Sequence, residues 1–425
     1  MISDLFLKPL SKTEGYQALV QAVEKNIGKT AAVFGLTEGA RTVLAGALSQ
    51  GRRTLVVTPS DQAALRMAED LSRSGVSALH FPARELTFYH MAAESRELVH
   101  RRIAVLGRLL DEQAQVVCAP IEALLIPLMP VEEFRRGIVK LDAGDVVDLD
   151  ELSKLLAEMG YVRQETVEAR GQFAVRGGIL DVYPVQSMTA WRIELFDDEV
   201  DSVRELDVMT QRSQPADEAC VIYPATEAAA DGNALLRAAC ALEAEVKNSG
   251  PVQRTPESEV PWLTDEENEA EDAAPADGAV IRRSSDGSAR SNTIDALKLG
   301  HRPEGLENLI PYLYEKPAFF SDYFDPELVV LDEAGRLRER AVNMGLEFAA
   351  KLERQEGFPG QSALMDSWDG FIRILEKRRS VTMGLLAVGI PDLKLCASVT
   401  IETRQAPDFQ GQTALLAEQL RDYAR

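Results

Sequence analysis

Residues that could bind a nucleotide phosphate lie early in the chain, in the run Gly35–Thr42 between an apolar segment and a helical pattern. A phosphate-binding loop of the form Gly-x-x-x-x-Gly-Lys-Ser/Thr uses backbone N–H groups and a lysine to hold phosphates, and a hydroxyl to hold Mg²⁺. Gly35 and Thr42 fit this pattern. Ala40, however, adds a Cβ where the loop must close on phosphate, and Arg41 replaces a compact ammonium with a longer planar group. The spacing therefore indicates a degenerate nucleotide loop.

An acidic pair far along the chain could complete such a site. Asp332 and Glu333 follow the apolar run 329–331. At the end of a buried strand, an Asp can hold Mg²⁺ and a Glu can orient water for hydrolysis. The alternative is an ordinary parallel strand that ends in an exposed acidic turn. Because the loop is degenerate, we expect no ATP hydrolysis, no bound cofactor and no catalytic residue in this chain.

A third group of residues is suited to protein contact. The run 171–204 reads as short strands separated by glycine-containing turns. Side chains alternate along a strand, so Arg192 and Phe196 share one face, and the opposite face is the better candidate for the core. Arg176 precedes the Gly177-Gly178 bend on a neighbouring strand, so the three side chains can converge. Arginine with an exposed aromatic is typical of protein interfaces. The alternative, which composition alone favours, is that Phe196 packs under the next turn.

Alternating strands and helices would position the nucleotide-like residues. Continuous apolar runs predict strands, and helical spacing predicts the segments between them. Strands are expected at 30–34, 54–58, 78–81, 115–119, 328–331 and 393–402, and helices at 39–49, 61–74, 95–110 and 335–355. This alternation predicts an α/β core, with a parallel sheet covered on both faces.

The pattern changes in the middle of the chain, where residues 131–213 predict one helix and then consecutive strands, an inserted α+β domain. Residues 1–130 would form the first part of the α/β core. Residues 214–405 would form its second part, beginning with helical residues 214–250. Low hydrophobicity and clustered acids predict a mobile insertion at 253–292. Residues 406–425 would be a linker and the start of a following domain.

Composition and charge restrict location and partners. A chain of 425 residues should form two to four domains. No segment approaches the roughly 20 apolar residues that span a membrane, and the N-terminus lacks a signal-peptide pattern, so we expect a cytoplasmic protein. The four cysteines and four histidines lack metal-binding spacing. With 46 basic and 68 acidic residues, the net charge of −22 disfavours DNA binding by this chain.

These segments together resemble one family, the transcription-repair coupling factors (Mfd), whose N-terminal part is similar to the excision-repair protein UvrB. The resemblance is carried by residues 171–204 and 147–169, by 81–86 and 95–102 before them, and by 327–333 and 405–411 after them. It is weak only at 229–301. It implies a UvrB- or helicase-like core without ATPase activity, and an inserted domain that binds the damage sensor UvrA through Arg176, Arg192 and Phe196.

The resemblance also implies a role in transcription-coupled nucleotide excision repair. This part would mimic UvrB and recruit UvrA to stalled RNA polymerase. A complete factor would add an RNA-polymerase-binding domain and an ATP- and Mg-dependent DNA translocase, with intramolecular contacts to this part. UvrB holds damaged DNA with a Tyr-rich hairpin, for which residues 88–95 leave no room. Two alternatives stay open: an active UvrB-type ATP-dependent DNA-binding helicase, and an autoinhibitory clamp on the translocase.

Overall fold

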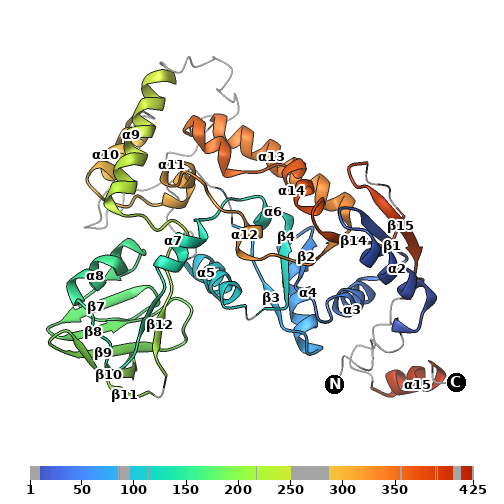
Figure 1. The fold of residues 1–425 in the computed structure, drawn as a ribbon, viewed down its shortest axis with the longest axis horizontal. Coiled ribbons are helices and arrows are strands. Elements are labelled where there is room, and N and C mark those ends of the chain that lie inside the picture. The colour runs from blue at the N-terminus through green and yellow to red at the C-terminus, as the bar shows by residue number, and fades with distance from the viewer. Residues whose placement is uncertain are drawn as a thin grey trace, which may run out of the picture.

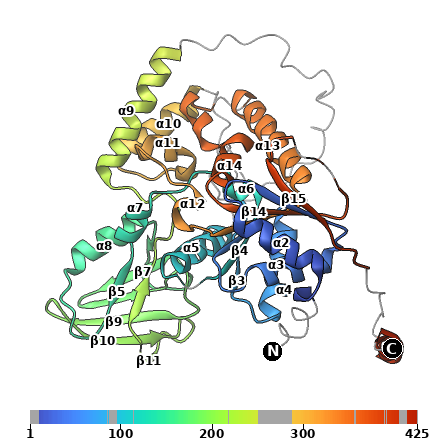
Figure 2. The same cartoon turned by 45° about the vertical axis from the view of Figure 1, so that its right-hand side comes forward.

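The protein forms an α/β core with a smaller β-rich module at one end, next to helix α5 (Figure 1 and Figure 2). The structure is a computed structural model. It describes residues 10–84, 86, 96–112, 114–216, 218–249, 287–354, 357–387, 389, 391–404 and 413–423. Within these ranges, every helix is too short or too polar to cross a lipid bilayer.

Seven parallel strands form the core sheet in the described part of the chain, in the order β15-β1-β14-β13-β2-β4-β3. The strands are β1 (Thr30–Phe34), β2 (Thr54–Thr58), β3 (Ala78–His80), β4 (Val116–Pro120), β13 (Leu328–Asp332), β14 (Arg379–Met383) and β15 (Leu395–Thr400). Two of the strands from the second half of the chain, β13 and β14, lie between β1 and β2. The two halves therefore build one sheet around the middle module, which confirms the predicted fold class.

Helices cover both faces of the core sheet, as expected for strands that read as continuous apolar runs. The helices that flank it are α2 (Glu14–Lys25), α3 (Glu38–Leu48), α4 (Asp61–Arg73), α5 (Arg96–Leu110), α13 (Ala334–Arg354) and α14 (Trp368–Leu375). Alternation along β2 places Val56 in a cluster with α3 and α4, while Leu55 and Val57 belong to the cluster on the opposite face. The hydroxyl of Ser60 fixes the start of α4 by accepting from the Ala63 N–H at 3.3 Å.

The middle module is built on a second sheet, which has six strands in the residues described, ordered β11-β10-β9-β8-β7-β6. Its elements are α8 (Leu149–Glu158), β6 (Val162–Arg163), β7 (Gln172–Arg176), β8 (Ile179–Val182), β9 (Ala190–Phe196), β10 (Glu199–Leu206) and β11 (Ser213–Pro215). Phe173, Leu180 and Ile193 are buried in one cluster with the apolar side of α8. The inner face of β9 is therefore the one that the alternation of side chains predicted.

Two paired strands connect the module to the core: β5 (Val139–Leu141) enters it and β12 (Cys220–Ile222) leaves it, in antiparallel register. Tyr223 then packs on Gly107 of α5, where an added Cβ would lie only 2.1 Å from the ring. The Tyr223 hydroxyl donates to Asp111 Oδ2 at 2.9 Å. The tyrosine is thus seated directly on the backbone of α5.

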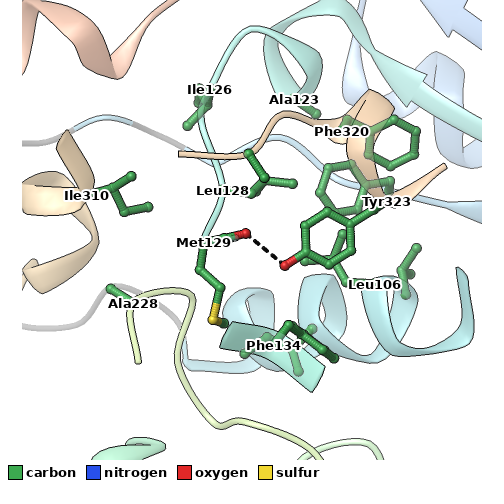
Figure 3. Packing of buried hydrophobic residues seen from close by; sticks show 14 of the residues in the cluster. Leu106, Ala123, Ile126, Leu128, Met129, Phe134, Ala228, Ile310, Phe320 and Tyr323 are labelled. Carbon is green, nitrogen blue, oxygen red and sulfur yellow. Dashed lines mark hydrogen bonds between the residues drawn. The ribbon is translucent and has the colours of Figure 1, made fainter. Parts of the chain in front are cut away.

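The hydrophobic core runs without interruption from the module into the α/β core. Figure 3 shows the joint, where Phe134 of α7 (Val131–Arg136) faces Tyr323 of α12 (Phe320–Tyr323), with ring centroids 5.8 Å apart. The Tyr323 hydroxyl donates to the Met129 carbonyl at 2.8 Å. The module is consequently part of one packed body.

The chain after the module differs from the sequence pattern, which predicted helix from residue 214. Strand β12 forms instead, because β5 supplies it with a partner that lies about 80 residues earlier, and α9 (Gly232–Ser249) begins only afterwards. The remaining elements are α6 (Ile121–Leu124), α10 (Gly287–Lys298), η2 (Leu306–Leu309), α11 (Ile310–Leu313), η3 (Pro359–Leu364) and α15 (Thr413–Tyr423).

Some sequence expectations fall on residues that the structure does not describe. In the predicted mobile insertion, residues 253–286 lie outside the described residues, whereas residues 287–292 begin helix α10. Residues 88–95, expected to leave no room for a DNA-clamping hairpin, and the predicted linker residues 406–412 also lie outside.

Candidate functional site

Two tight turns form one end of the module sheet, where β7 meets β8 and β9 meets β10. Gly177 has φ +61°, and a Cβ on Gly178 would lie 2.7 Å from the Leu195 carbonyl oxygen. The Leu195 N–H donates to the Gly178 carbonyl at 2.7 Å, so the first turn lies against β9. The glycine pair therefore provides the bend that the sequence predicted, and it also permits close approach of the next strand.

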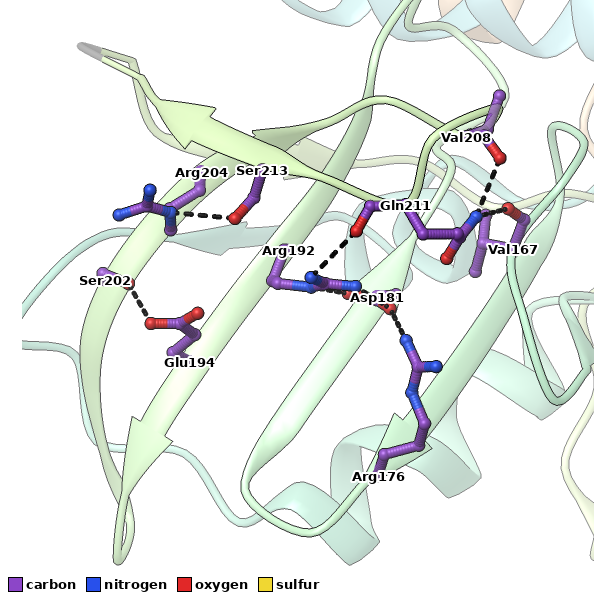
Figure 4. Close-up of polar contacts among 10 residues, drawn as sticks. All are labelled: Val167, Arg176, Asp181, Arg192, Glu194, Ser202, Arg204, Val208, Gln211 and Ser213. Atoms are coloured by element: carbon purple, nitrogen blue, oxygen red, sulfur yellow. Dashed lines mark hydrogen bonds and ion pairs between the residues drawn. The ribbon is translucent and has the colours of Figure 1, made fainter.

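Arg192 and Asp181 form an ion pair in the middle of the outer face of the module sheet (Figure 4). The two residues are register partners on β9 and β8. The Nε of Arg192 donates to Asp181 Oδ1 at 2.6 Å, and Nη2 donates to Oδ2 at 2.9 Å. The Asp181 side chain is 0% exposed and that of Arg192 is 15% exposed. The hydrogen bond to Asp181 raises the pKa of Arg192 above its ordinary value.

Arg176 reaches the same carboxylate from β7, on the other side of β8 (Figure 4). Its Nη2 donates to Asp181 Oδ2 at 2.5 Å, while 47% of its side chain remains exposed. The two predicted arginines therefore meet on a residue that the sequence reasoning did not name. The signal was present: a lone acid in the apolar strand 179–182, at a position that alternation places on the outer face.

Phe196 ends β9 and is 81% exposed, so the alternative that it packs under the next turn is wrong. The reason is local: the turn consists of Asp197 and Asp198, which offer no apolar surface to cover a ring. Along β9, the ring stands about 13 Å from Arg192, given a rise of about 3.3 Å per residue. Arg176 is level with Glu194, between the two, by its register through Ile179.

Hydrogen bonds order the rest of the outer face (Figure 4). The Ser202 hydroxyl donates to Glu194 at 3.0 Å, and Arg204 Nε donates to the Ser213 hydroxyl at 3.0 Å. The backbone carbonyl of Gln211 accepts from Arg192 Nη1 at 3.4 Å. The side-chain amide of Gln211 donates to the Val167 and Val208 carbonyls. Hydrogen bonds thus order the polar side chains of this face, which also carries a small buried apolar cluster that includes Ala174 and Ala190.

In the nucleotide-like loop, Arg41 is bonded to the acidic pair Asp332 and Glu333. Its Nη1 lies 2.5 Å from Asp332 Oδ1 and 3.6 Å from Glu333 Oε2. The side chains of Arg41 and Asp332 are 14% and 7% exposed. Burial raises the pKa of Asp332 to about 6, although the charge and hydrogen bond of Arg41 act in the opposite direction. The structure therefore brings the two ends of the predicted nucleotide site together and joins them by an ion pair.

Backbone donors at the start of the loop are bonded within the chain. The Gly35 N–H donates to the Leu385 carbonyl at 3.1 Å, and the Leu36 N–H donates to the Gly384 carbonyl at 3.2 Å. The Thr37 N–H donates to the Thr403 hydroxyl at 2.8 Å. These are the kind of donors with which a phosphate loop holds its anion. In this chain the segments before and after β15 accept from them instead.

The other loop residues support this closed arrangement. Gly35 has φ +83°, and a Cβ there would lie 2.7 Å from the Ile401 carbonyl oxygen. Ala40 packs its methyl group against the apolar cluster under α3, and Thr42 lies half-buried on the same helix. Among the residues that the structure describes, no group of three or more His, Cys, Asp or Glu side chains could hold a metal ion.

The comparisons with known proteins identify the module by class. Residues 139–227 match the family model described as UvrB interaction domain, a stretch that starts with β5 and ends shortly after β12. The chain therefore carries a UvrB interaction domain within an α/β core of parallel strands.

The particular relatives are transcription-repair-coupling factors, as the sequence resemblance predicted. The Bacillus subtilis protein is 27% identical over 98% of this chain and 34% of its own length. The Staphylococcus haemolyticus protein is 27% identical over 81% of this chain and 27% of its own length. A Staphylococcus aureus protein is 25% identical over 92% of this chain and 32% of its own length. The chain spans about a third of the length of these curated relatives.

Proposed function

We propose that this chain is the UvrB-mimicking part of a transcription-repair coupling factor, and that it recruits UvrA to stalled RNA polymerase. The UvrB interaction domain match and the similarity to coupling factors over most of the chain support this role. One structural observation carries the proposal: the docking face, defined as Arg176, Arg192 and Phe196, presents an ordered guanidinium pair on the same side of the sheet as an 81% exposed aromatic ring.

The geometry suits a protein partner with acidic side chains and an apolar pocket. The hydrogen bond of Arg176 to Asp181 uses Nη2, and the guanidinium has further N–H donors for a carboxylate of UvrA. Phe196 stands at the tip of the sheet, where its ring can enter a pocket without displacing a neighbour. The chemistry is recognition, and no bond is made or broken.

We further propose that the chain itself neither binds nor hydrolyses ATP. The ion pair of Arg41 with Asp332 and the internally bonded N–H groups of the loop support this proposal. They also disfavour the alternative of an active UvrB-type helicase. ATP, Mg²⁺, DNA and RNA polymerase would be bound by other parts of a complete factor, which would also make intramolecular contacts with this part.

The test is a titration of UvrA with the wild-type chain and with Arg176→Ala and Phe196→Ala. Loss of an anchor side chain at an interface typically costs about 2 kcal/mol or more, which is roughly thirtyfold in affinity. Arg163→Ala is the matched control, because Arg163 is an exposed arginine on edge strand β6 of the same sheet. Unchanged affinity for both variants, with normal melting curves, would place the docking surface elsewhere.

A further inference from the structure

Asp181 is a fully buried carboxylate bonded to two arginines of the docking face, one of which is half-exposed. One carboxylate therefore bonds two guanidinium groups. Buried carboxylates are usually compensated by a positive charge and hydrogen bonds, because removal from water is costly.

Arg192 alone meets that need. Its two bonds reach both carboxylate oxygens in the fork-to-fork geometry that arginine and carboxylate favour. Arg192 is also the more buried of the two arginines. The bond from Arg176 is therefore not required to neutralise Asp181, and its effect falls on Arg176, whose chain would otherwise move freely in solvent.

We infer that Asp181 is the positioning residue of the docking face: it holds the Arg176 guanidinium in place before the partner arrives. This inference rests on the proposed function and adds a residue to it. The backbone of Arg176 is level with Glu194, and the bond from Nη2 to Asp181 holds its guanidinium next to Arg192, the register partner of Asp181. A side chain ordered in advance loses less conformational freedom on binding.

The first test needs no partner. Phenylglyoxal modifies free guanidinium groups, and mass spectrometry of the wild-type chain gives the rate at each arginine. Arg176 should react more slowly than Arg163, the exposed arginine of edge strand β6. In Asp181→Asn the Arg176 rate should rise to about that of Arg163, because a neutral amide holds a guanidinium weakly. Equal rates at Arg176 and Arg163 in the wild type would overturn the inference.

The second test measures affinity for UvrA. Asp181→Asn should weaken binding about three- to tenfold, the cost of ordering one or two long side chains. In an Arg176→Ala background, the same change should have a smaller effect, because only the bonds between Asp181 and Arg192 remain to be lost. A full and additive loss in that background would mean that Asp181 acts through Arg192 or the fold and not through Arg176.

Glu122→Gln is the matched control for loss of a carboxylate, since Glu122 accepts from Arg340 at 2.5 Å far from the docking face. It should leave UvrA affinity unchanged.

If Asp181→Asn does not fold, Arg176→Lys is tested in its place, because lysine keeps the positive charge but lacks the planar fork of donors. We expect about threefold weaker binding for Arg176→Lys, whereas wild-type affinity would show that only the charge matters.

The outcomes separate the two proposals. If the wild-type chain does not bind UvrA, the proposed function fails, while the phenylglyoxal rates still decide whether Asp181 positions Arg176. If the wild-type chain binds UvrA and Asp181→Asn changes neither the Arg176 rate nor the affinity, the positioning role is wrong and the proposed function stands.

Discussion

The nucleotide-like loop and the docking face use the same pair of groups, a guanidinium and a buried aspartate, in opposite ways. At the loop, Arg41 is 14% exposed and is bonded to Asp332. At the docking face, Arg176 is 47% exposed although it is bonded to Asp181. An ion pair with a buried carboxylate therefore withdraws one arginine from solvent and orders the other where a partner can reach it.

The carboxylates that the arginines contact explain the difference. At the loop, Arg41 and Arg336 face Asp332 and Glu333, with Arg336 only 2.7 Å from Glu333, so the formal charges cancel. No positive charge is left for a phosphate. At the docking face, Arg192 already bonds both oxygens of Asp181, and Arg176, which shares Oδ2, keeps 47% of its side chain exposed.

The largest expected effect is on stability, in Arg192→Ala. The variant removes both bonds that Arg192 makes to a carboxylate with no exposure, so we expect a loss of about 3 kcal/mol of unfolding free energy. Phe196→Ala should stay within about 0.5 kcal/mol of the wild type, because the ring is exposed. Urea unfolding measures both. The sequence placed Arg192 on the outer face, yet its side chain is only 15% exposed, so its substitution is not neutral for stability.

Equal stability of Arg192→Ala and Phe196→Ala would contradict the comparison, since it would mean that Arg176 alone compensates Asp181. The double variant Arg176→Ala with Arg192→Ala then decides the matter, because it leaves the buried carboxylate without either cation.

An intermediate effect is expected from pH at the loop. The pKa of Asp332 is raised by burial to about 6 from an ordinary 3.8, so the folded state binds the proton more tightly than the unfolded state. This contribution to stability is fully present below pH 3.8 and is lost as pH rises to about 6. Between pH 5 and 7.5 the loss should be about 1.5 kcal/mol.

Asp332→Asn isolates this contribution, because the asparagine does not titrate. The unfolding free energy of the wild type, measured relative to that of the variant, should fall as the pH rises from 5 to 7.5. A difference that stays constant from pH 5 to 7.5 would show that Arg41 keeps Asp332 ionised despite its burial. The Arg41–Asp332 pair would then resemble the ion pairs of Asp181 more closely than the burial of Asp332 indicates.

The smallest expected effect is on nucleotide binding. Isothermal titration of the wild-type chain with Mg-ATP should detect no binding tighter than about 1 mM. The double variant Ala40→Gly with Arg41→Lys restores the phosphate-loop pattern, yet it should also fail to bind. The Gly35, Leu36 and Thr37 N–H groups would still be bonded to the segments around β15.

Micromolar binding by this double variant would show that the two substituted side chains, and not the bonded backbone, close the loop. Thr403→Ala then tests the backbone contribution by itself, because it removes the acceptor of the Thr37 N–H while leaving Arg41 bonded to Asp332.

The sequence predicted the core sheet well, because a strand buried on both faces shows its burial in its own residues. The expected strands at 30–34 and 54–58 coincide with β1 and β2. Strand β12 was missed because its partner β5 is distant in sequence, so the local pattern could not show the pairing. Asp181 was missed for a related reason: its function depends on side chains from two other strands. The residue pattern of one strand shows which of its side chains share a face. A site formed by several strands can be located only when the register between those strands is known.

The contact of Tyr223 with Gly107 has a mechanical consequence. An added methyl group would lie 2.1 Å from the ring, so the module has no clearance to turn on α5 without opening the shared core. Its two connections, β5 and β12, are paired with each other and cannot act as independent hinges. A partner held at the docking face would therefore keep a fixed angle to the core sheet. Any force on that partner would be transmitted to the α/β core through the apolar cluster that the two share.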